Sequence, residues 1–177
     1  GFSYQNDAPI DMRMSREDPV SAKDLVNTWS EAELREIIER YGEERYAGRI
    51  ARNLVSARER APIETTGQLA GLIKAAIPAA ARRQGPHPAK RTFQALRIAV
   101  NQEIELLEQS VRDCIDCLKP DGVLAVITFH SLEDRIVKTV FAQAAHPCTC
   151  PPDFPVCVCG KKPLGEPANR KPILPSA

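Results

Sequence analysis

The sequence has 177 residues, of which 43% are hydrophobic and 27% charged. This composition is typical of globular proteins and excludes a chain that is disordered throughout. No apolar run approaches the roughly 18 residues that a membrane-spanning helix needs, and no apolar segment follows a basic start, so we expect a cytoplasmic protein without membrane segments. The nine glycines never occur at Gly-x-Gly spacing, which excludes the usual glycine-rich phosphate or dinucleotide loop.

The net charge of +1 conceals separate blocks of charge along the chain. Residues 65–102 carry six bases and no acid, whereas residues 103–134 carry eight acids and two bases. From residue 135 to residue 177 there are six bases and two acids. Solvated helix faces and a basic surface for a polyanion both account for such blocks.

Helices are predicted in the first half of the chain. Residues 1–20 are polar and interrupted by prolines, which predicts an irregular segment. Apolar residues then recur at helical spacing, and three capping signatures precede the apolar stripes. The predicted caps are Ser21, Ser30 and Thr65. We therefore predict a helical subdomain over residues 21–88, which ends in a stretch rich in proline and glycine.

A different order of elements is predicted for residues 89–177. Apolar residues recur every three or four positions over residues 93–118, which predicts one long helix. The apolar run at residues 123–129 lacks alternation and is typical of a strand buried on both faces of a parallel sheet. A further helix is expected after it, with Ser131 as the cap. This order predicts an α/β fold in which the other strands come from elsewhere in a parent protein or from another chain.

The strongest candidate for a site is the segment 129–135, where the predicted strand ends and a helix begins. Ligands of open α/β sheets bind outside the carboxyl ends of strands. The candidate residues there are His130, Ser131, Glu133 and Asp134, with Arg135 beside them. A local interpretation is also open, in which Ser131 caps the helix and the two acids complement its dipole. No Gly-x-Ser-x-Gly elbow surrounds Ser131, so the spacing does not support a hydrolase.

Six cysteines form the second feature of interest. Two Cys-x-Cys pairs are formed by Cys148, Cys150, Cys157 and Cys159. Four thiolates suit zinc, although paired zinc ligands are usually separated by two to four residues. Disulfides and thiols without a metal are the other two interpretations, and a reducing cytoplasm disfavours the disulfides. Cys114 and Cys117 fall in the predicted long helix, where we expect them to be buried.

Basic residues outside these segments are candidates for contacts with the phosphates of a nucleic acid. With Arg135, the candidates are Lys90, Arg91, Arg97, Lys161, Lys162, Arg170 and Lys171. Aromatic residues make up only 5% of the chain, so stacking of bases on aromatic side chains is not indicated.

Several motifs follow one another along the chain: GFSY (1–4), PIDMRM (9–14), GEER (42–45), RIA (49–51), RTFQALRIAVN (91–101), FHSLEDR (129–135), CTCPP (148–152) and CGKKP (159–163). In this order they resemble the MraW family of 16S rRNA methyltransferases. The resemblance extends over essentially the whole chain. It implies a partial class I, Rossmann-like methyltransferase fold with an inserted all-helical subdomain. It also implies S-adenosylmethionine as the methyl donor and N4-methylation of a cytidine in 16S rRNA, as a step of rRNA processing in ribosome biogenesis.

The resemblance further implies that the main donor-binding loop precedes the GFSY segment in this family. That loop is absent from this sequence, so we expect no donor-binding residue here and regard the chain as the C-terminal portion of an enzyme, inactive alone. The implied partner is 16S rRNA or the small ribosomal subunit, and a homodimer stays open. His130, Ser131, Glu133 and Asp134 are the candidate contacts on the cytidine side. A noncatalytic RNA-binding or zinc-binding interaction module is the alternative interpretation.

Overall fold

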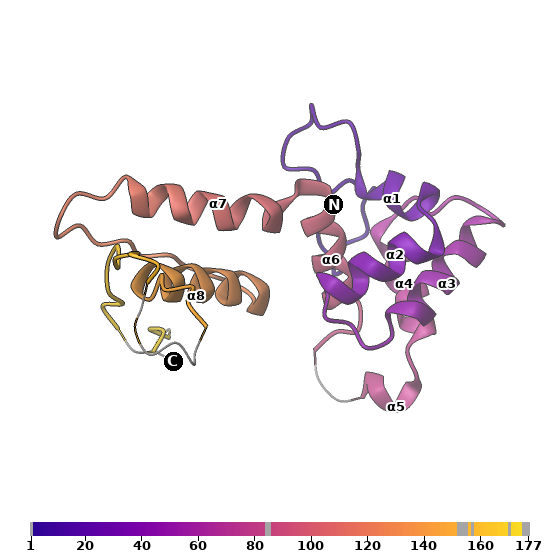
Figure 1. The fold of residues 1–177 in the computed structure, drawn as a ribbon. Helices are drawn as coiled ribbons and strands as arrows, with labels where there is room; N and C mark the ends of the chain where they lie inside the picture. The colour runs from indigo at the N-terminus through magenta and orange to yellow at the C-terminus, as the bar shows by residue number, and fades with distance from the viewer. Residues whose placement is uncertain (1, 84–85, 152–155, 157, 170, 175–177) are drawn as a thin grey trace. The chain divides into compact units, whose positions relative to one another are not determined.

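The computed structural model describes residues 2–83, 86–151, 156, 158–169 and 171–174. These residues form eight α-helices and no β-strand (Figure 1). Pro9 and Thr65 make an isolated β-bridge. The chain divides into two compact units, residues 1–103 and residues 104–177. None of the described helices is both long and apolar enough to span a membrane.

Six helices occur among the described residues of the first unit. They are α1 (Ala22–Thr28), α2 (Glu31–Arg40), α3 (Ala47–Arg58), α4 (Thr66–Ala76), α5 (Ala79–Arg82) and α6 (Lys90–Asn101). α3 packs against α2 and α4, while α6 packs against α1 and α2. Fully buried leucine and isoleucine side chains from α1, α2, α3, α4 and α6 form the core of this unit. Burial of these apolar stripes is the main force that holds the short helices together.

Three of these helices begin with a reciprocal capping box at the residue that the sequence predicts. The pairs are Ser21 with Asp24 in α1, Ser30 with Glu33 in α2, and Thr65 with Gln68 in α4. In each pair the hydroxyl accepts a hydrogen bond from the third helical N–H, and the longer side chain accepts one from the N–H of the cap residue. Each box therefore gives partners to two N–H groups that the helix itself cannot pair.

The N-terminal segment contains no helix, as predicted, but hydrogen bonds fix it to the helical unit. The Thr66 N–H donates to the carbonyl of Ala8 at 2.8 Å, and the Ala8 N–H donates to the Thr66 hydroxyl at 3.0 Å. The Ile10 N–H donates to the carbonyl of Glu64 at 3.1 Å. These partners lie more than fifty positions apart in the sequence, so local sequence patterns do not indicate them.

Asn101, the last residue of α6, holds a turn of the N-terminal segment in place. Its Nδ2 donates to the carbonyl of Met12 at 2.8 Å, and its Oδ1 accepts from the Met14 N–H at 2.8 Å. Met12 is fully buried although its φ is +61°, a region that residues with a side chain rarely adopt. The two hydrogen bonds that Asn101 makes therefore stabilise a backbone conformation of Met12 that is unfavourable by itself.

The long helix predicted over residues 93–118 is interrupted. α6 ends at Asn101, and α7 (Glu103–Asp116) begins directly after Gln102. Gln102 has φ 51° and ψ 37°, which is the left-handed region. A single left-handed residue leaves the spacing of the apolar residues in the sequence unchanged. The break at Gln102 therefore cannot be recognised from helical spacing.

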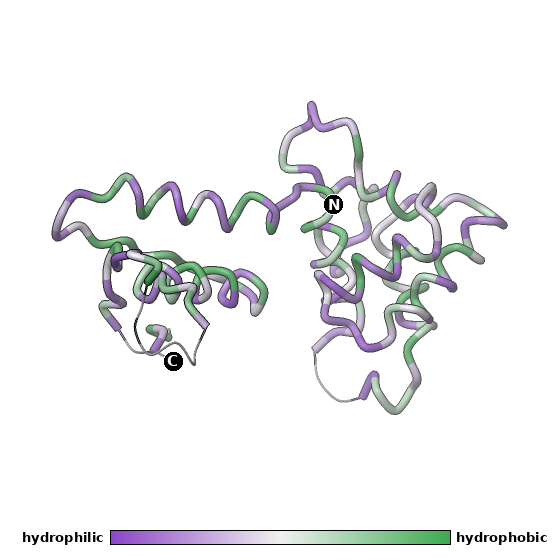
Figure 2. Tube along the Cα trace, viewed as in Figure 1, coloured by the Kyte–Doolittle hydropathy of each residue, from purple (hydrophilic) through white to green (hydrophobic). Residues whose placement is uncertain are grey.

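The second unit contains α7 and α8 (Ser131–Ala145) among its described residues. A small apolar cluster is centred on Val111 of α7 and on Val137 and Val140 of α8. Leu124 and Val126, from the extended segment between these helices, pack against this cluster. Figure 2 shows this segment as a continuous apolar stretch that follows α7 and leads into α8.

The predicted α/β, Rossmann-like fold is wrong for this structure, because the described residues contain no sheet. The run 123–129 is extended and alternates in exposure. Leu124 and Val126 are packed, whereas Val123, Ile127 and Phe129 are 77%, 82% and 89% exposed. A strand requires a neighbouring strand to pair with its N–H and C=O groups, and the run forms no β-bridge with any described residue. Apolar composition alone therefore led to the wrong prediction.

We expect Asn101→Ala to lower the melting temperature by several degrees. The substitution removes the partner of the part-buried Met12 carbonyl, a loss that typically costs about 1–3 kcal/mol, and that of the exposed Met14 N–H, which water can replace. Thermal unfolding followed by circular dichroism measures the effect, with Asn169→Ala at an exposed position as the matched control. Equal melting temperatures for the two variants would contradict the role of Asn101.

Acid is expected to destabilise the first unit. The pKa values of Asp7, Asp11, Asp24 and Glu33 all lie below the ordinary range. The chief cause for Asp11 is the hydrogen bond from the Arg13 guanidinium, at 2.6 Å. A carboxyl group with a lowered pKa stabilises the folded state above its unfolded pKa and loses that contribution as the pH falls through its folded pKa.

Urea unfolding should therefore show the stability decreasing as the pH drops below about 4. Asp11→Asn is expected to reduce this decrease, because the amide cannot titrate. Glu166→Gln, at an exposed position of the second unit, serves as the control. The same acid dependence in the Asp11→Asn variant and in the unmodified chain would refute the assignment.

Candidate functional site

The segment 129–135 lies at the start of α8, as the sequence predicts, but its helix cap is His130 rather than Ser131. The Nδ1 atom of His130 accepts from the Glu133 N–H at 3.4 Å. The Glu133 carboxylate accepts from the N–H groups of Phe129 and His130 at 2.8 and 3.3 Å. Histidine is not among the preferred cap residues, which explains why the sequence pattern pointed to the neighbouring serine.

Capping involves one of the two ring nitrogens of His130. The other, Nε2, lies 3.3 Å from a carboxylate oxygen of Glu133 and is buried, but makes no hydrogen bond with any described residue. The His130 side chain is 9% exposed and that of Glu133 is 21% exposed, so Glu133 is the more accessible of the two.

The other candidates of this segment are directed elsewhere. The Asp134 carboxylate accepts a hydrogen bond from the Lys138 ammonium at 2.6 Å, one turn further along α8. Ser131 and Arg135 are exposed. The structure thus brings His130 and Glu133 together through the cap and pairs Asp134 with a lysine. The arrangement offers one accessible carboxylate whose position is fixed by two backbone N–H groups.

The predicted phosphate contacts divide between the two units. Lys90, Arg91 and Arg97 belong to α6, where Arg91 donates to the carbonyl of Glu43 at 3.0 Å and Arg97 lies 3.1 Å from a carboxylate oxygen of Glu103. In the second unit the exposed candidates are Arg135, Lys161, Lys162 and Lys171. Arg170 lies outside the described residues. Arg97 already has a carboxylate partner, which weakens its candidacy for a phosphate contact.

A hollow of about 610 Å³ lies between α2 and α3, outside every segment predicted as a site from the sequence. Its charged lining consists of Arg35, Arg45, Arg49 and Arg52 with Glu39, Glu43 and Glu44. Arg35 pairs with Glu39, and Arg52 pairs with Glu31 of α2. The spacing of Arg45, Arg49 and Arg52 by four and three residues indicates one helix face in the sequence. The mixture of both charges in the hollow gives it no clear preference for an anion.

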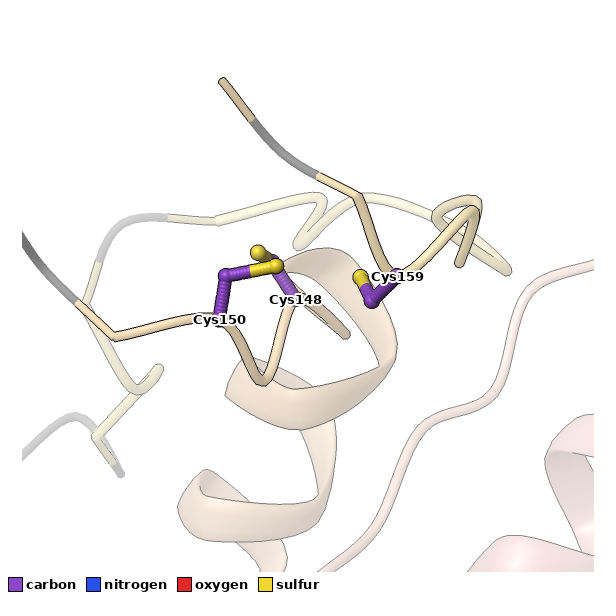
Figure 3. Close-up of side chains that lie close together, drawn as sticks. All are labelled: Cys148, Cys150 and Cys159. Atoms are coloured by element: carbon purple, nitrogen blue, oxygen red, sulfur yellow. The ribbon is translucent and has the colours of Figure 1, made fainter. Parts of the chain in front are cut away.

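Three of the four cysteines in the Cys-x-Cys pairs lie close together. The sulfur atoms of Cys148, Cys150 and Cys159 are all within 4.8 Å of one another (Figure 3). Cys157 lies outside the described residues. Cys148 also lines a hollow of about 500 Å³ at the C-terminal ends of α7 and α8, together with Lys161. Among the described residues, these thiols are the only group in which several soft metal ligands converge.

The expectation that Cys114 and Cys117 are buried is wrong, because both are exposed. Among the residues of α7 only Val111 is fully covered. α7 therefore carries more apolar residues at helical spacing than α8 and the extended segment cover.

Comparison with known proteins identifies the relatives of this chain. Residues 1–177 match the MraW methylase family. A protein named "Ribosomal RNA small subunit methyltransferase H" from Symbiobacterium thermophilum is 63% identical over 176 residues, which are 99% of this chain and 55% of that protein. Proteins of the same name from Brevibacillus brevis and a Paenibacillus species are each 57% identical over 176 residues, 99% of this chain and 56% of each protein.

The chain thus spans about half the length of the curated relatives that it matches. The match includes every motif from GFSY to CGKKP on which the resemblance rested. The chain belongs to the MraW methylase family.

Proposed function

We propose that this chain is part of a cytoplasmic methyltransferase that transfers a methyl group from S-adenosylmethionine to N4 of a cytidine in 16S rRNA, and that it is inactive alone. The observation that carries this proposal is the 63% identity, over 99% of the chain, to a protein named as an rRNA small subunit methyltransferase. Membership of the MraW methylase family over all residues supports the same reaction class.

The described residues do not fit the methyl donor. They contain no glycine-rich loop at the end of a strand, and the two hollows are lined mainly by charged and polar side chains with a few aliphatic ones. We therefore assign donor binding to none of these residues. Their proposed contribution is to hold the RNA substrate.

Glu133 is the residue best suited to contact the target amino group. A carboxylate has about four acceptor sites, and the N–H groups of Phe129 and His130 use only part of them. The remaining sites can accept from the hydrogens of an exocyclic amine and so orient its nitrogen toward the methyl group. His130 acts as a positioning residue in this proposal, because its buried ring fixes the start of α8 and thereby the Glu133 carboxylate.

Two exposed lysines next to the cysteines are the proposed phosphate contacts of the second unit. Lys161 and Lys162 are adjacent in sequence, and both are exposed. Two neighbouring ammonium groups attract the phosphate backbone without reading its sequence.

In the complete enzyme, Glu133→Gln is expected to lower the rate of methyl transfer to 16S rRNA about tenfold or more, since the charged acceptor is lost. Glu166→Gln, at an exposed position of the same unit, is the matched control. Transfer of labelled methyl groups to the small-subunit RNA measures the rate. Full activity of Glu133→Gln would support the noncatalytic interpretation of this segment.

A pair of His130 variants separates positioning from direct contact. Asparagine is a preferred helix cap, so His130→Asn should retain most of the activity, whereas His130→Ala should lose about 0.5–2 kcal/mol of stability and much of the activity. Equal loss in both variants would show that the imidazole itself is needed, against the role of a cap.

Replacing Lys161 and Lys162 by glutamine should weaken binding of 16S rRNA and lower the slope of log affinity against log salt by about 1.5. Lys23→Gln is the control, because the Lys23 ammonium already pairs with Glu64 at 2.6 Å. An unchanged slope would exclude these two lysines from the RNA interface.

A further inference from the structure

The thiols of Cys148, Cys150 and Cys159 converge from two separate segments of the second unit. Cys148 and Cys150 follow the end of α8, and Cys159 comes nine residues after Cys150. Figure 3 shows the three sulfur atoms directed toward one another, each within 4.8 Å of the other two. Cys150 and Cys159 are half-buried and Cys148 is exposed.

A backbone hydrogen bond closes the loop that carries these thiols. The Leu164 N–H donates to the carbonyl of Ala144 in the last turn of α8, at 2.9 Å. The chain therefore returns to the end of α8 shortly after Cys159. Gly160 has a φ of +65°, a conformation that favours glycine, and it turns the chain directly after Cys159.

The distances suit a thiolate-bound zinc ion. Four ligands at the usual Zn–S distance of about 2.3 Å in a tetrahedron place the sulfur atoms about 3.8 Å apart. The three sulfur atoms lie within 4.8 Å of one another, which is compatible with a separation of about 3.8 Å. The sulfur atoms of Cys148 and Cys150 lie within 4.8 Å of each other, so both can reach one ion despite the short Cys-x-Cys spacing.

The grouping of three sulfurs favours a metal over a disulfide. All three sulfur atoms lie within 4.8 Å of one another, so one metal ion can contact all of them, whereas a disulfide joins only two cysteines. The neighbouring Lys161, which lines the same hollow as Cys148, offsets part of the negative charge that several thiolates would bring.

The segment that carries the thiols also has little apolar burial to order it. Every described residue from 151 to 174 is exposed apart from Cys159, and no described residue after α8 is in a helix. A metal ion that links both ends of such a loop supplies folding free energy that the hydrophobic effect does not supply there.

We propose that Cys148, Cys150 and Cys159 bind a structural zinc ion that holds Cys159 next to Cys148 and Cys150 at the end of α8. The sequence provides a further thiol, Cys157, which lies outside the described residues. The zinc ion belongs to the fold of the second unit, and its presence does not depend on the proposed methyl transfer.

The chain purified under reducing conditions is expected to contain about one zinc ion per molecule by elemental analysis. Cobalt added to the metal-free chain should give the intense visible absorption of a thiolate-bound tetrahedral ion. The variant Cys148→Ser/Cys150→Ser/Cys159→Ser should lose both signals. Cys114→Ser/Cys117→Ser is the matched control, because it removes exposed cysteines of the same unit and should keep both.

Proteolysis provides a readout that does not depend on metal analysis. Removal of zinc by a chelator should accelerate trypsin cleavage between Lys161 and Lys162 about tenfold, while the far-ultraviolet circular dichroism of the helices stays unchanged. A reduced chain without zinc that also fails to bind cobalt would overturn the proposal. Zinc retained by the triple serine variant, or a disulfide among these cysteines in the purified chain, would do so as well.

Discussion

The pairing of backbone N–H groups at helix starts is the constraint on which the rest of this structure depends. Four of the eight helices among the described residues begin with a reciprocal capping box, at Ser21, Ser30, Thr65 and His130. The helices are short, and short helices are only marginally stable in water without caps and tertiary packing. The same device thus defines the helical unit and fixes the segment proposed to contact RNA. At His130 a group expected to act on a substrate is required by the fold itself.

The predictions from sequence succeeded where the cause is local. Serine or threonine followed three residues later by an acid or glutamine identified three caps, because both partners lie within one turn. The cap at His130 was missed because an imidazole nitrogen replaces the usual hydroxyl as the acceptor. The break at Gln102 was missed because helical spacing carries no information about one left-handed residue. The contacts of Asn101 with Met12 and Met14 join residues nearly ninety positions apart, which no local pattern can indicate.

The helix start in the candidate segment was predicted correctly, whereas the roles of its residues stay a prediction. The position of FHSLEDR at the start of a helix follows from the sequence. The hydrogen-bond partners of its individual residues are known only from the structure. Glu133 faces the backbone of the cap, and Asp134, its neighbour, faces Lys138. The two adjacent carboxylates therefore have different partners, which their shared chemistry and neighbouring positions in the sequence do not indicate. The convergence of the cysteines likewise depends on the return of the chain to α8, which the spacing alone left open among three interpretations.

The extended run at residues 123–129 has a consequence for the behaviour of the chain in solution. Its exposed apolar side chains, at Val123, Ile127 and Phe129, lie on backbone that forms no β-bridge with any described residue, although the Phe129 N–H donates to the Glu133 carboxylate. A long edge of this kind, rich in β-branched residues and without a charge, is a template onto which the same segment of another molecule can add. The isolated chain thus exposes an uncharged apolar segment of the kind that favours association between copies of a protein.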